Sequence, residues 1–549
     1  MPMLGVSAIY LRVNQAGYLP NDSKLAWALT DVDLSGQSFM VISSPGGEIV
    51  FTDGVVGTDR GPYGNFPHLY ELDFSALSTP AVYHVLLGGS ESPDFTIGGN
   101  VYFSLLSPTL EFFHIQRCGK KASSLHGPCH LTDGVSKSKI VLGEPYKASG
   151  GWHDAGDYLK FLITAGFSTN MLLASYAHQS AILDNIDNNS NGVSDILDEA
   201  LIGLNWILKL WDPERQILYY QVGDASDHEQ GWRMPEEDDV NLPQRFVWAC
   251  KKGKGANVAG KAAAALALGA AIWNDSTKPF YNPERAAIYL KAAKQIYAYG
   301  QTRPSAQATT SDGSFVFYNE SSWKDDMALA AIELYRATGK AKFLDQAREY
   351  ATKAGNSYSF SWGDMNGLVH YEIASLDASY IPNAISLLNA DLEGMQDASN
   401  NNSFRAAVNA FFWGSASEMI GVALEALWYE KISGDSQYRS LALAQCNYVL
   451  GANPWGVCWV NSVGTVWAHH PHHFVSALTA SELVGFWNEG PLPQEDWDSL
   501  GITLQNPDAY SAFQSDQAVY HDDREDYATN EPIITANAQG IALASIMSD

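Results

Sequence analysis

The spacing of apolar residues changes near residue 104, and this change constrains the fold of the 549-residue chain more than any other feature. Residues 8–98 hold about seven short runs rich in β-branched and aromatic residues, which is typical of a small β-sandwich. Turn signals such as Pro45-Gly46-Gly47 separate these runs. Beyond residue 104 the apolar residues recur at helical spacing. We therefore expect a β-sandwich domain over 1–98 and a helical domain over 104–549.

The helical part is expected to form an α/α barrel. The stretch from Asn257 to Trp273 is small and apolar almost all round, which is typical of a helix buried on most faces. Buried helices of this kind favour two concentric rings over a solenoid, because the sequence has no fixed-period repeat. The spacing predicts helices over 106–121, 158–178, 193–211, 257–274, 284–299, 325–337, 341–354, 382–392, 415–432, 435–449 and 531–547. Long loops, which commonly carry function, are expected at 212–256, 300–324 and 450–530.

Charge and composition exclude several classes of function. The chain has 61 acidic and 33 basic residues, a formal net charge of −28. Without a cluster of Lys and Arg it is not expected to bind nucleic acid, and an anionic membrane would repel it. No apolar run approaches the roughly 20 residues of a membrane span. A neutral substrate fits, and the 16 Trp and 27 Tyr suggest sugar rings, with core packing as the alternative.

Cysteine usage and the N-terminus bear on the cellular compartment. Five cysteines are an odd and sparse set, so the chain is not a disulfide scaffold. The first residues lack the charged and apolar regions of a signal peptide. The protein is therefore either cytoplasmic or secreted with a signal peptide already removed, and we expect the secreted form.

The segment from Gly150 to Tyr158, Gly-Gly-Trp-His-Asp-Ala-Gly-Asp-Tyr, is the first candidate for catalytic chemistry. Asp154 and Asp157 stand three residues apart in a Gly-rich turn that opens a predicted helix. Backbone N–H groups at a helix start keep a carboxylate ionised, which suits a general base. The alternative is an Asp that caps the helix beside a solvated neighbour.

A second acidic segment lies near the C-terminus. Glu531 directly precedes Pro532, and together they open the last predicted helix. Pro is common in the first turn of a helix, so helix capping is the alternative reading.

Two further segments contain metal-ligand patterns. Two Cys and two His are enough to close a tetrahedral zinc site, and the candidates are Cys118, Cys129, His130 and His153. The alternative is a pair of buried thiols with surface histidines. Residues 187–198 fit the twelve-residue calcium loop, and its candidate ligands are Asp187, Asn189, Asn191, Val193, Asp195 and Asp198. An Asn-rich turn before a helix cap is the alternative there.

Together these segments resemble glycoside hydrolase family 9, the inverting cellulases, over nearly the whole chain. Residues 13–20 resemble the start of that family's immunoglobulin-like domain, and Gly150 to Tyr158 match its GGWHDAGDY motif. Residues 191–199 match its NGxPDxLDE segment with Ser194 in place of Pro, and 227–236 resemble its DHxxWxxPE segment. Trp413-Gly414-Ser415, Gly451-Ala452-Asn453-Pro454, Pro471-His472-His473 and Asn530-Glu531 also match.

The resemblance implies a fold and a set of roles. The expected fold is mainly α, an (α/α)6 barrel behind a small immunoglobulin-like β-sandwich. Asp157 would be the general base that activates water, Asp154 would help to hold that water, and Glu531 would be the general acid. The candidate substrate contacts are His228, Trp232, Trp362, Trp413 and His472. Zinc and calcium would be structural, the substrate a β-glucan, and the protein a monomer.

The chain also departs from the family pattern. Phe474 replaces an Arg, Ala416 an Asn and Ala536 an aromatic residue, while residues 484–490 replace a Gly-Gly-Pro-Asn stretch. The sequence therefore predicts an inverting β-1,4-glucanase and leaves exo action, as a cellodextrinase or glucosaminidase, as a close alternative. Two further alternatives are an inactive carbohydrate-binding relative and a metal-dependent hydrolase. The second would need an open metal position, which four protein ligands do not leave.

Overall fold

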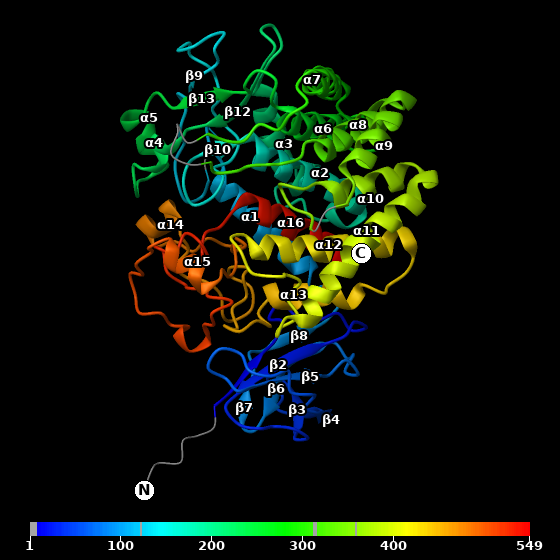
Figure 1. Cartoon of the computed structure of the whole chain (residues 1–549), viewed down its shortest axis with the longest axis vertical. Helices are drawn as coiled ribbons and strands as arrows, with labels where there is room; N and C mark the ends of the chain where they lie inside the picture. Colours follow the sequence, from blue (N-terminus) through cyan, green and yellow to red (C-terminus); the bar gives the residue numbers. More distant parts are fainter. Residues whose placement is uncertain (1–7, 121–122, 311–315, 357–358) are drawn as a thin grey trace.

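The computed structural model describes residues 8–120, 123–310, 316–356 and 359–549. A β-domain at one end of the molecule is joined to a larger helical body (Figure 1). Each part has its own hydrophobic core. The break in apolar spacing near residue 104 falls between the last strand of the β-domain and the first long helix.

The β-domain consists of two antiparallel sheets packed as a sandwich. One sheet has the strand order β1 (Ile9–Arg12), β2 (Leu25–Thr30), β5 (His68–Asp73). The other has the order β4 (Ile49–Val55), β3 (Ser38–Ser43), β6 (Ala81–Leu87), β7 (Ser90–Glu91), with β8 (Phe95–Ile97) also paired to β6. Alternate residues such as Phe39, Val41, Tyr83 and Val85 face the shared core. This domain confirms the predicted immunoglobulin-like sandwich.

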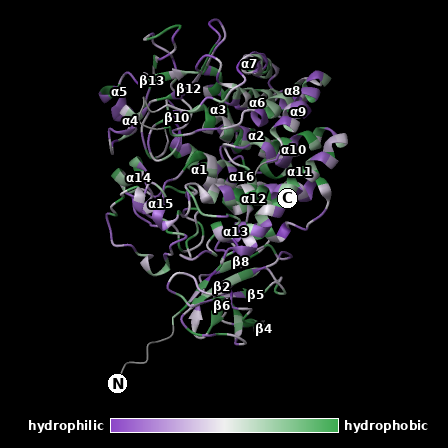
Figure 2. Cartoon of the chain, in the orientation of Figure 1, coloured by the Kyte–Doolittle hydropathy of each residue, from purple (hydrophilic) through white to green (hydrophobic). Residues whose placement is uncertain are grey.

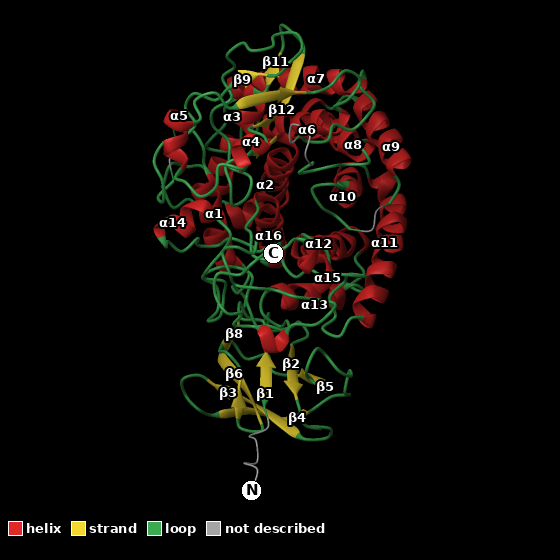
Figure 3. Cartoon of the chain, turned by 60° about the vertical axis from the view of Figure 1, so that its left-hand side comes forward, coloured by secondary structure: helices red, strands yellow, loops and turns green. Residues whose placement is uncertain are grey.

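The helical body is an (α/α)6 barrel, as predicted. Its inner helices contact one another in a closed ring: α2 (Leu162–Leu183), α6 (Ala256–Trp273), α8 (Lys324–Thr338), α10 (Asn366–Leu376), α12 (Ser415–Ser433) and α16 (Ile534–Met547). The outer helices are α1 (Leu106–Gln116), α3 (Asp195–Lys209), α7 (Pro283–Gln301), α9 (Ala341–Ala354), α11 (Ile381–Asn401) and α13 (Arg439–Val449). Figure 3 shows the ring of inner helices with α9 and α11 outside it.

The two rings differ in amphipathicity. Inner helices are apolar on nearly every face because they pack against both neighbours and the outer ring. Figure 2 shows this contrast, with hydrophilic residues prominent on the outer helices α7 and α9. Helix α6 is long and apolar enough to cross a membrane, but 94% of its 18 residues are buried inside the fold. It is therefore a core helix, and the ion pairs of its Lys261 with Glu320 and Asp326 are equally buried.

The long connections contain more structure than the sequence indicated. A small sheet lies at the end of the barrel opposite the sandwich (Figure 1), built from β9 (Val135–Ser136), β10 (Lys160–Phe161), β11 (Trp211–Asp212), β12 (Ile217–Val222) and β13 (Phe246–Ala249). The loops also hold the short helices α4 (Ala225–His228), α5 (Asp238–Asn241), α14 (Phe474–Thr479) and α15 (Gln494–Ser499), and the 3₁₀ turns η1 (Phe103–Leu105), η2 (Pro235–Glu237), η3 (Ala378–Tyr380) and η4 (Ser511–Phe513). The long loops predicted over 212–256 and 450–530 therefore contain short strands and helices as well as irregular segments.

Three predicted helix starts were wrong by three or four residues. Helix α13 begins at Arg439 and not at 435, and the other two lie at candidate catalytic segments. The helix expected from residue 158 begins at Leu162, because residues 160–161 pair with β12 as strand β10. The helix expected from residue 531 begins at Ile534. Asp157 therefore lies in a bend and Glu531 in a non-helical segment, and both precede the first turn of the helix that follows, α2 or α16.

The sandwich is bonded to the barrel through the segment after β1. The Gln15 side chain donates to the Gly456 carbonyl at 2.9 Å and accepts from the N–H groups of Thr465 and Val466, each at 2.9 Å. Gln15 is also 95% buried, as its exposed fraction is 5%. The loop that follows α13 therefore depends on the sandwich for its hydrogen bonds.

Candidate active site

The turn over residues 150–158 lies against the C-terminal end of α1. The His153 N–H donates to the Gln116 carbonyl at 2.8 Å, and the Asp154 N–H donates to the Leu159 carbonyl at 2.9 Å. The second of these bonds closes a tight loop that holds both carboxylates of the motif just before the start of α2. Both side chains are buried, with exposed fractions of 2% for Asp154 and 8% for Asp157.

Asp157 is held in its charged form. His228 Nδ1 lies 2.7 Å from Asp157 Oδ2, and the Leu159 N–H donates to Asp157 Oδ1 at 2.8 Å. Burial alone would raise the pKa of Asp157, but the His228 hydrogen bond and charge, together with the Leu159 N–H, lower it overall. The structure thus makes His228, a predicted substrate contact, a hydrogen-bond partner of the predicted base.

The pKa of Asp154 is shifted in the opposite direction, toward the protonated form. Its two carboxyl oxygens accept hydrogen bonds from the hydroxyls of Thr164 and Tyr318. Burial raises the pKa of Asp154 to about 7, and the neighbouring charge of Asp157 acts in the same direction. The two Asp of the motif therefore differ in protonation near neutral pH, although they stand only three residues apart.

Glu531 reaches the same site from the far end of the chain. The Gly156 N–H donates to Glu531 Oε1 at 2.9 Å, so the residue before Asp157 directly binds the predicted acid. Burial raises the pKa of Glu531 well above its usual value, and the charges of Asp157, Glu489 and Asp154 raise it further. Oppositely shifted pKa values in neighbouring carboxyls are the pattern that separates a general acid from a general base.

Gly156 is required by close packing. A Cβ at this position would lie 2.1 Å from the His472 carbonyl oxygen and 3.0 Å from Glu531 Oε1. The Gly156 carbonyl also accepts from the Phe474 N–H at 2.9 Å. One glycine thus joins the Asp157 turn, the 472–474 segment and Glu531.

Aromatic side chains surround the carboxyls. Trp232 lies with its ring centre 5.0 Å from His472 and 4.9 Å from Phe474, and His472 contributes to the field at Asp157. Trp362 packs edge-on against Tyr318 at 4.9 Å, on the Asp154 side. In a further contact, Trp413, which is 44% exposed, lies 5.6 Å from Tyr527. His228 and His472 thus lie close to Asp157, with Trp232 packed on His472. Trp362 lies on the Asp154 side, and Trp413 is placed by its contact with Tyr527.

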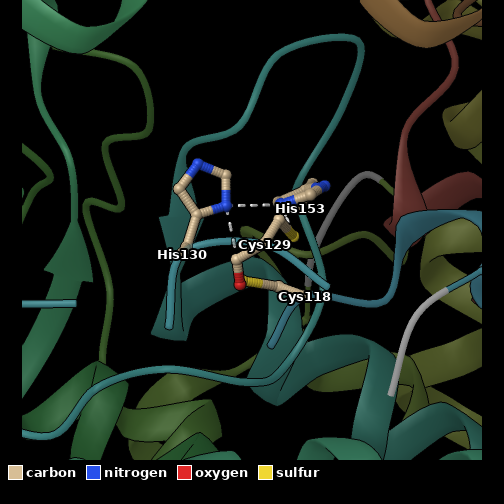
Figure 4. A group of neighbouring side chains, drawn as sticks. All are labelled: Cys118, Cys129, His130 and His153. Atoms are coloured by element: carbon tan, nitrogen blue, oxygen red, sulfur yellow. Dashed lines mark hydrogen bonds between the residues drawn. The ribbon is translucent and has the colours of Figure 1, made fainter. Parts of the chain in front are cut away.

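The Cys and His of the predicted zinc site converge below this turn (Figure 4). The four ligand atoms of Cys118, Cys129, His130 and His153 lie within 4.8 Å of one another, and all four residues are buried. His130 Nε2 lies 2.9 Å from Asp238 Oδ2, so its Nδ1 is the nitrogen free to face the cluster. A carboxylate behind a ligating His is a common outer partner in metal sites. Because His153 adjoins Asp154, a metal here would fix the turn over residues 150–158.

The predicted calcium loop connects α2 to α3. The Asp187 carboxylate accepts from the N–H groups of Asn191 and Gly192, at 3.1 and 3.0 Å. The Asn189 and Asn191 side-chain amides donate to Asp198 Oδ2 at 2.8 and 2.7 Å. The loop is therefore closed by amide–carboxylate hydrogen bonds, and a 180° turn of both amides would direct their oxygens inward instead. Calcium at this loop stays a prediction.

Sequence reasoning missed two residues of the site. Tyr318, which binds Asp154, lies in a stretch expected to be a loop without motif. Glu489 is 93% buried, as its exposed fraction is 7%, and burial together with the charge of Asp154 raises its pKa to about 8. A Glu in the segment that departs from the family pattern was the available signal for the second residue.

A double ring of helices with acidic and aromatic side chains gathered at one site defines a glycoside hydrolase, and comparison with known proteins agrees. The model of "Glycosyl hydrolase family 9" matches residues 102–544, and that of "Cellulase N-terminal ig-like domain" matches residues 7–92. The chain belongs to glycosyl hydrolase family 9.

Individual relatives are distant in sequence but similar along the whole chain. A xyloglucan-specific endo-beta-1,4-glucanase of Bacteroides ovatus is 27% identical and covers 97% of this chain and 93% of its own length. Endoglucanase C of Cellulomonas fimi is 26% identical over 98% of this chain and 52% of its own length. The crystal structure of a metagenome-derived family 9 endoglucanase superposes with a TM-score of 0.82 at 25% identity, covering 98% of this chain and 99% of its own.

Proposed function

We propose that the protein is an inverting endo-β-1,4-glucanase with Asp157 as general base and Glu531 as general acid. The observation that carries the proposal is the Gly156 bridge, which binds Glu531 directly beside Asp157 while the two carboxyls have opposite pKa shifts. Asp157, charged and bonded to His228, would take a proton from the attacking water. Glu531, whose raised pKa favours the protonated form, would give its proton to the leaving oxygen. Asp154 would help to hold the water.

The aromatic surround supports a sugar polymer as substrate. Trp232, Trp362, Trp413 and His472 offer flat faces that suit the apolar faces of β-linked glucose rings. Relatives named endoglucanases, and one named a xyloglucan-specific endo-beta-1,4-glucanase, support β-1,4-glucan as the polymer. We also propose that the protein is a monomer and that it acts outside the cell, as expected from the sequence.

The metals of the proposal are structural. An N₂S₂ donor set with its atoms within 4.8 Å fits tetrahedral Zn²⁺, and four protein ligands leave no position for a substrate. A solved family 9 relative is described as a "Zn-binding triple mutant", with a TM-score of 0.80 at 23% identity, and it supports the fold alone. Ca²⁺ is proposed for the loop over 187–198 because its oxygen-bearing residues follow the ligand spacing.

The test is product analysis on cellopentaose, with the anomeric form of the fresh product followed by NMR. We expect the α-anomer from the wild type, internal cleavage products, and a loss of at least about 100-fold in kcat for Glu531→Gln, since general acid catalysis contributes that much. Glu525→Gln is the matched control, because Glu525 lies in the same segment and its carboxylate pairs, among the residues that the structure describes, only with Arg524 at 3.5 Å. A β-anomer as first product, or equal activity of the two variants, would refute the assignment.

A further inference from the structure

The small sheet at the end of the barrel brings three loop segments to one edge. Strand β12 lies between β10 and β13, and its last residue, Val222, pairs with both Lys160 and Val247. Because both neighbours run antiparallel to β12, the residues that precede β10 and β13 lie beside those that follow β12. Tyr158, Arg245 and helix α4 therefore meet at this edge, although 87 positions separate Tyr158 from Arg245.

The Arg245 side chain fills the space between these segments. Its Nη2 donates to the Tyr158 carbonyl at 2.6 Å, and its Nε lies 2.9 Å from Asp227 Oδ2. Arg245 is buried, so both interactions lie inside the fold. Gly223 leaves room for them, because a Cβ there would lie 2.7 Å from Asp227 Oδ2 and 3.2 Å from Arg245 Nη2. The guanidinium thus bridges the turn over residues 150–158 to α4.

The bridge closes a ring of contacts around the proposed base. Tyr158 directly follows Asp157, and Asp227 directly precedes His228. His228 Nδ1 in turn lies 2.7 Å from Asp157 Oδ2. A planar guanidinium presents its N–H groups in fixed directions and can hold two partners at a set distance, unlike a flexible ammonium. The two contacts of Arg245 therefore set where His228 stands relative to Asp157.

We propose that Arg245 is a positioning residue, which holds His228 against Asp157 by tying α4 to the turn of the proposed base. Arg245 is buried behind these residues and acts on the reaction through them. This inference rests on the proposed function, since it takes Asp157 as the general base. It adds a residue outside the motifs to the set on which the base depends.

A purely electrostatic role for Arg245 is the alternative. Burial alone would lower the pKa of Arg245, but the charges of Asp133 and Asp227 raise it overall, so the side chain stays cationic. A cation at this depth favours the ionised form of Asp157 whether or not it holds α4 in place. Arg245→Lys separates the two roles, because Lys keeps the charge but lacks the planar group that holds Tyr158 and Asp227 together.

The charges around the base stay the same in this variant. Besides His228, the ionisable groups that face Asp157 lie on the 472–474 segment, on the same turn and before α16: His472, His473, Asp154 and Glu531. Arg245→Lys changes none of them. A move of the acidic limb of the pH profile, where the base becomes protonated, would therefore report the contact between His228 and Asp157.

The test measures the pH profile of kcat/KM on cellopentaose for Arg245→Lys, His228→Ala and the double variant. A nearby cation lowers the pKa of an Asp by about 1–3 pH units, so a loosened His228 should move the acidic limb to higher pH by up to that amount. We expect Arg245→Lys to lose about 10- to 100-fold in kcat/KM, since a misplacement of about 1 Å costs about 100-fold. The double variant should move the limb no further than His228→Ala alone, because Arg245 then has no His to position.

The matched control is Arg336→Lys, which makes the same change in another buried ion pair. Arg336 pairs with Glu333 and Glu372 at the far end of α8 from the Tyr318 segment. This variant should keep the pH profile of the wild type. If Arg245→Lys does not fold, Asp227→Asn removes the other end of the bridge and should move the limb in the same direction.

The outcomes separate the inference from the proposed function. If His228→Ala moves the limb but Arg245→Lys does not, or if the two shifts add in the double variant, the inference is wrong and the proposed function stands. If neither change moves the limb, the assignment of Asp157 as the base fails, and the inference fails with it.

Discussion

Replacing Gly156 with Ala tests whether the glycine bridge sets the geometry of the site. The new methyl group would lie 2.1 Å from the His472 carbonyl oxygen, and real Cβ atoms essentially never approach closer than 3.0 Å, so the two segments must separate by at least about 0.9 Å. Gly156 has an ordinary backbone conformation, because its φ is not positive, and Ala adds no backbone strain of its own. The effect therefore arises from this contact alone.

The expected loss can be worked from that displacement. A misplacement of about 1 Å between reacting groups costs about 100-fold in rate, and overpacking of a tight site costs about 1–3 kcal/mol of stability. We therefore expect Gly156→Ala to lose about 100-fold in kcat/KM on cellopentaose and to unfold a few degrees lower. The loss should exceed what the lower stability explains, because the Gly156 N–H to Glu531 bond lies at the point of contact.

The matched control is Gly394→Ala in the exposed face of α11, where a Cβ meets nothing within 4 Å. Ala is about 1 kcal/mol better than Gly inside a helix, so this variant should be fully active and slightly more stable. Activity of Gly156→Ala within threefold of the wild type, measured beside the control, would show that the turn is free to adjust. The bridge would then not position the acid and base.

Three further predictions test separate parts of the structure. His228→Ala should move the acidic limb of the pH profile of kcat/KM to higher pH, because it removes the bond that lowers the pKa of Asp157, and an unmoved limb would contradict this role. Cys129→Ser, or a strong chelator, should lower the melting temperature and reduce bound zinc, whereas Cys446→Ser, a buried thiol outside the cluster, should leave the zinc content unchanged. Gln15→Ala should cost about 1–3 kcal/mol by leaving buried backbone groups unpaired, and an unchanged denaturant midpoint would show that the interface contributes nothing.

The sequence predicted the elements with strong periodicity and missed those that depend on distant pairing. The bounds of helix α6 were predicted to within one residue, because a stretch of small and apolar residues of this length is typical of a buried helix. Strands β12 and β13 were missed because each is completed by partners elsewhere in the chain, including β9 and β10. The two-residue strand β10 also explains why α2 begins at Leu162, since no local pattern distinguishes Lys160 and Phe161 from a helix start.

The candidate site follows the same division. Asp154, Asp157 and Glu531 were predicted because their motifs are local, and the four metal-type ligands because their residue types are rare. Tyr318 and Glu489 were missed because each acts through a contact with a residue far along the chain. Nothing near Glu489 in sequence indicates that it lies opposite Glu531, because the pairing joins a segment expected to be a loop to residues expected to open a helix.

Closure of the barrel is itself the step that assembles the site. The inner ring closes where the last helix, α16, packs against the first inner helix, α2. At that seam the Ile534 N–H, in the first residue of α16, donates to the Asp154 carbonyl at 3.1 Å, three residues after Glu531. The same seam thus brings Glu531, which precedes α16, to the turn that holds Asp157. A fold that must close its ring to bury its core therefore also brings together two carboxyls that stand 374 positions apart in sequence, 531 − 157.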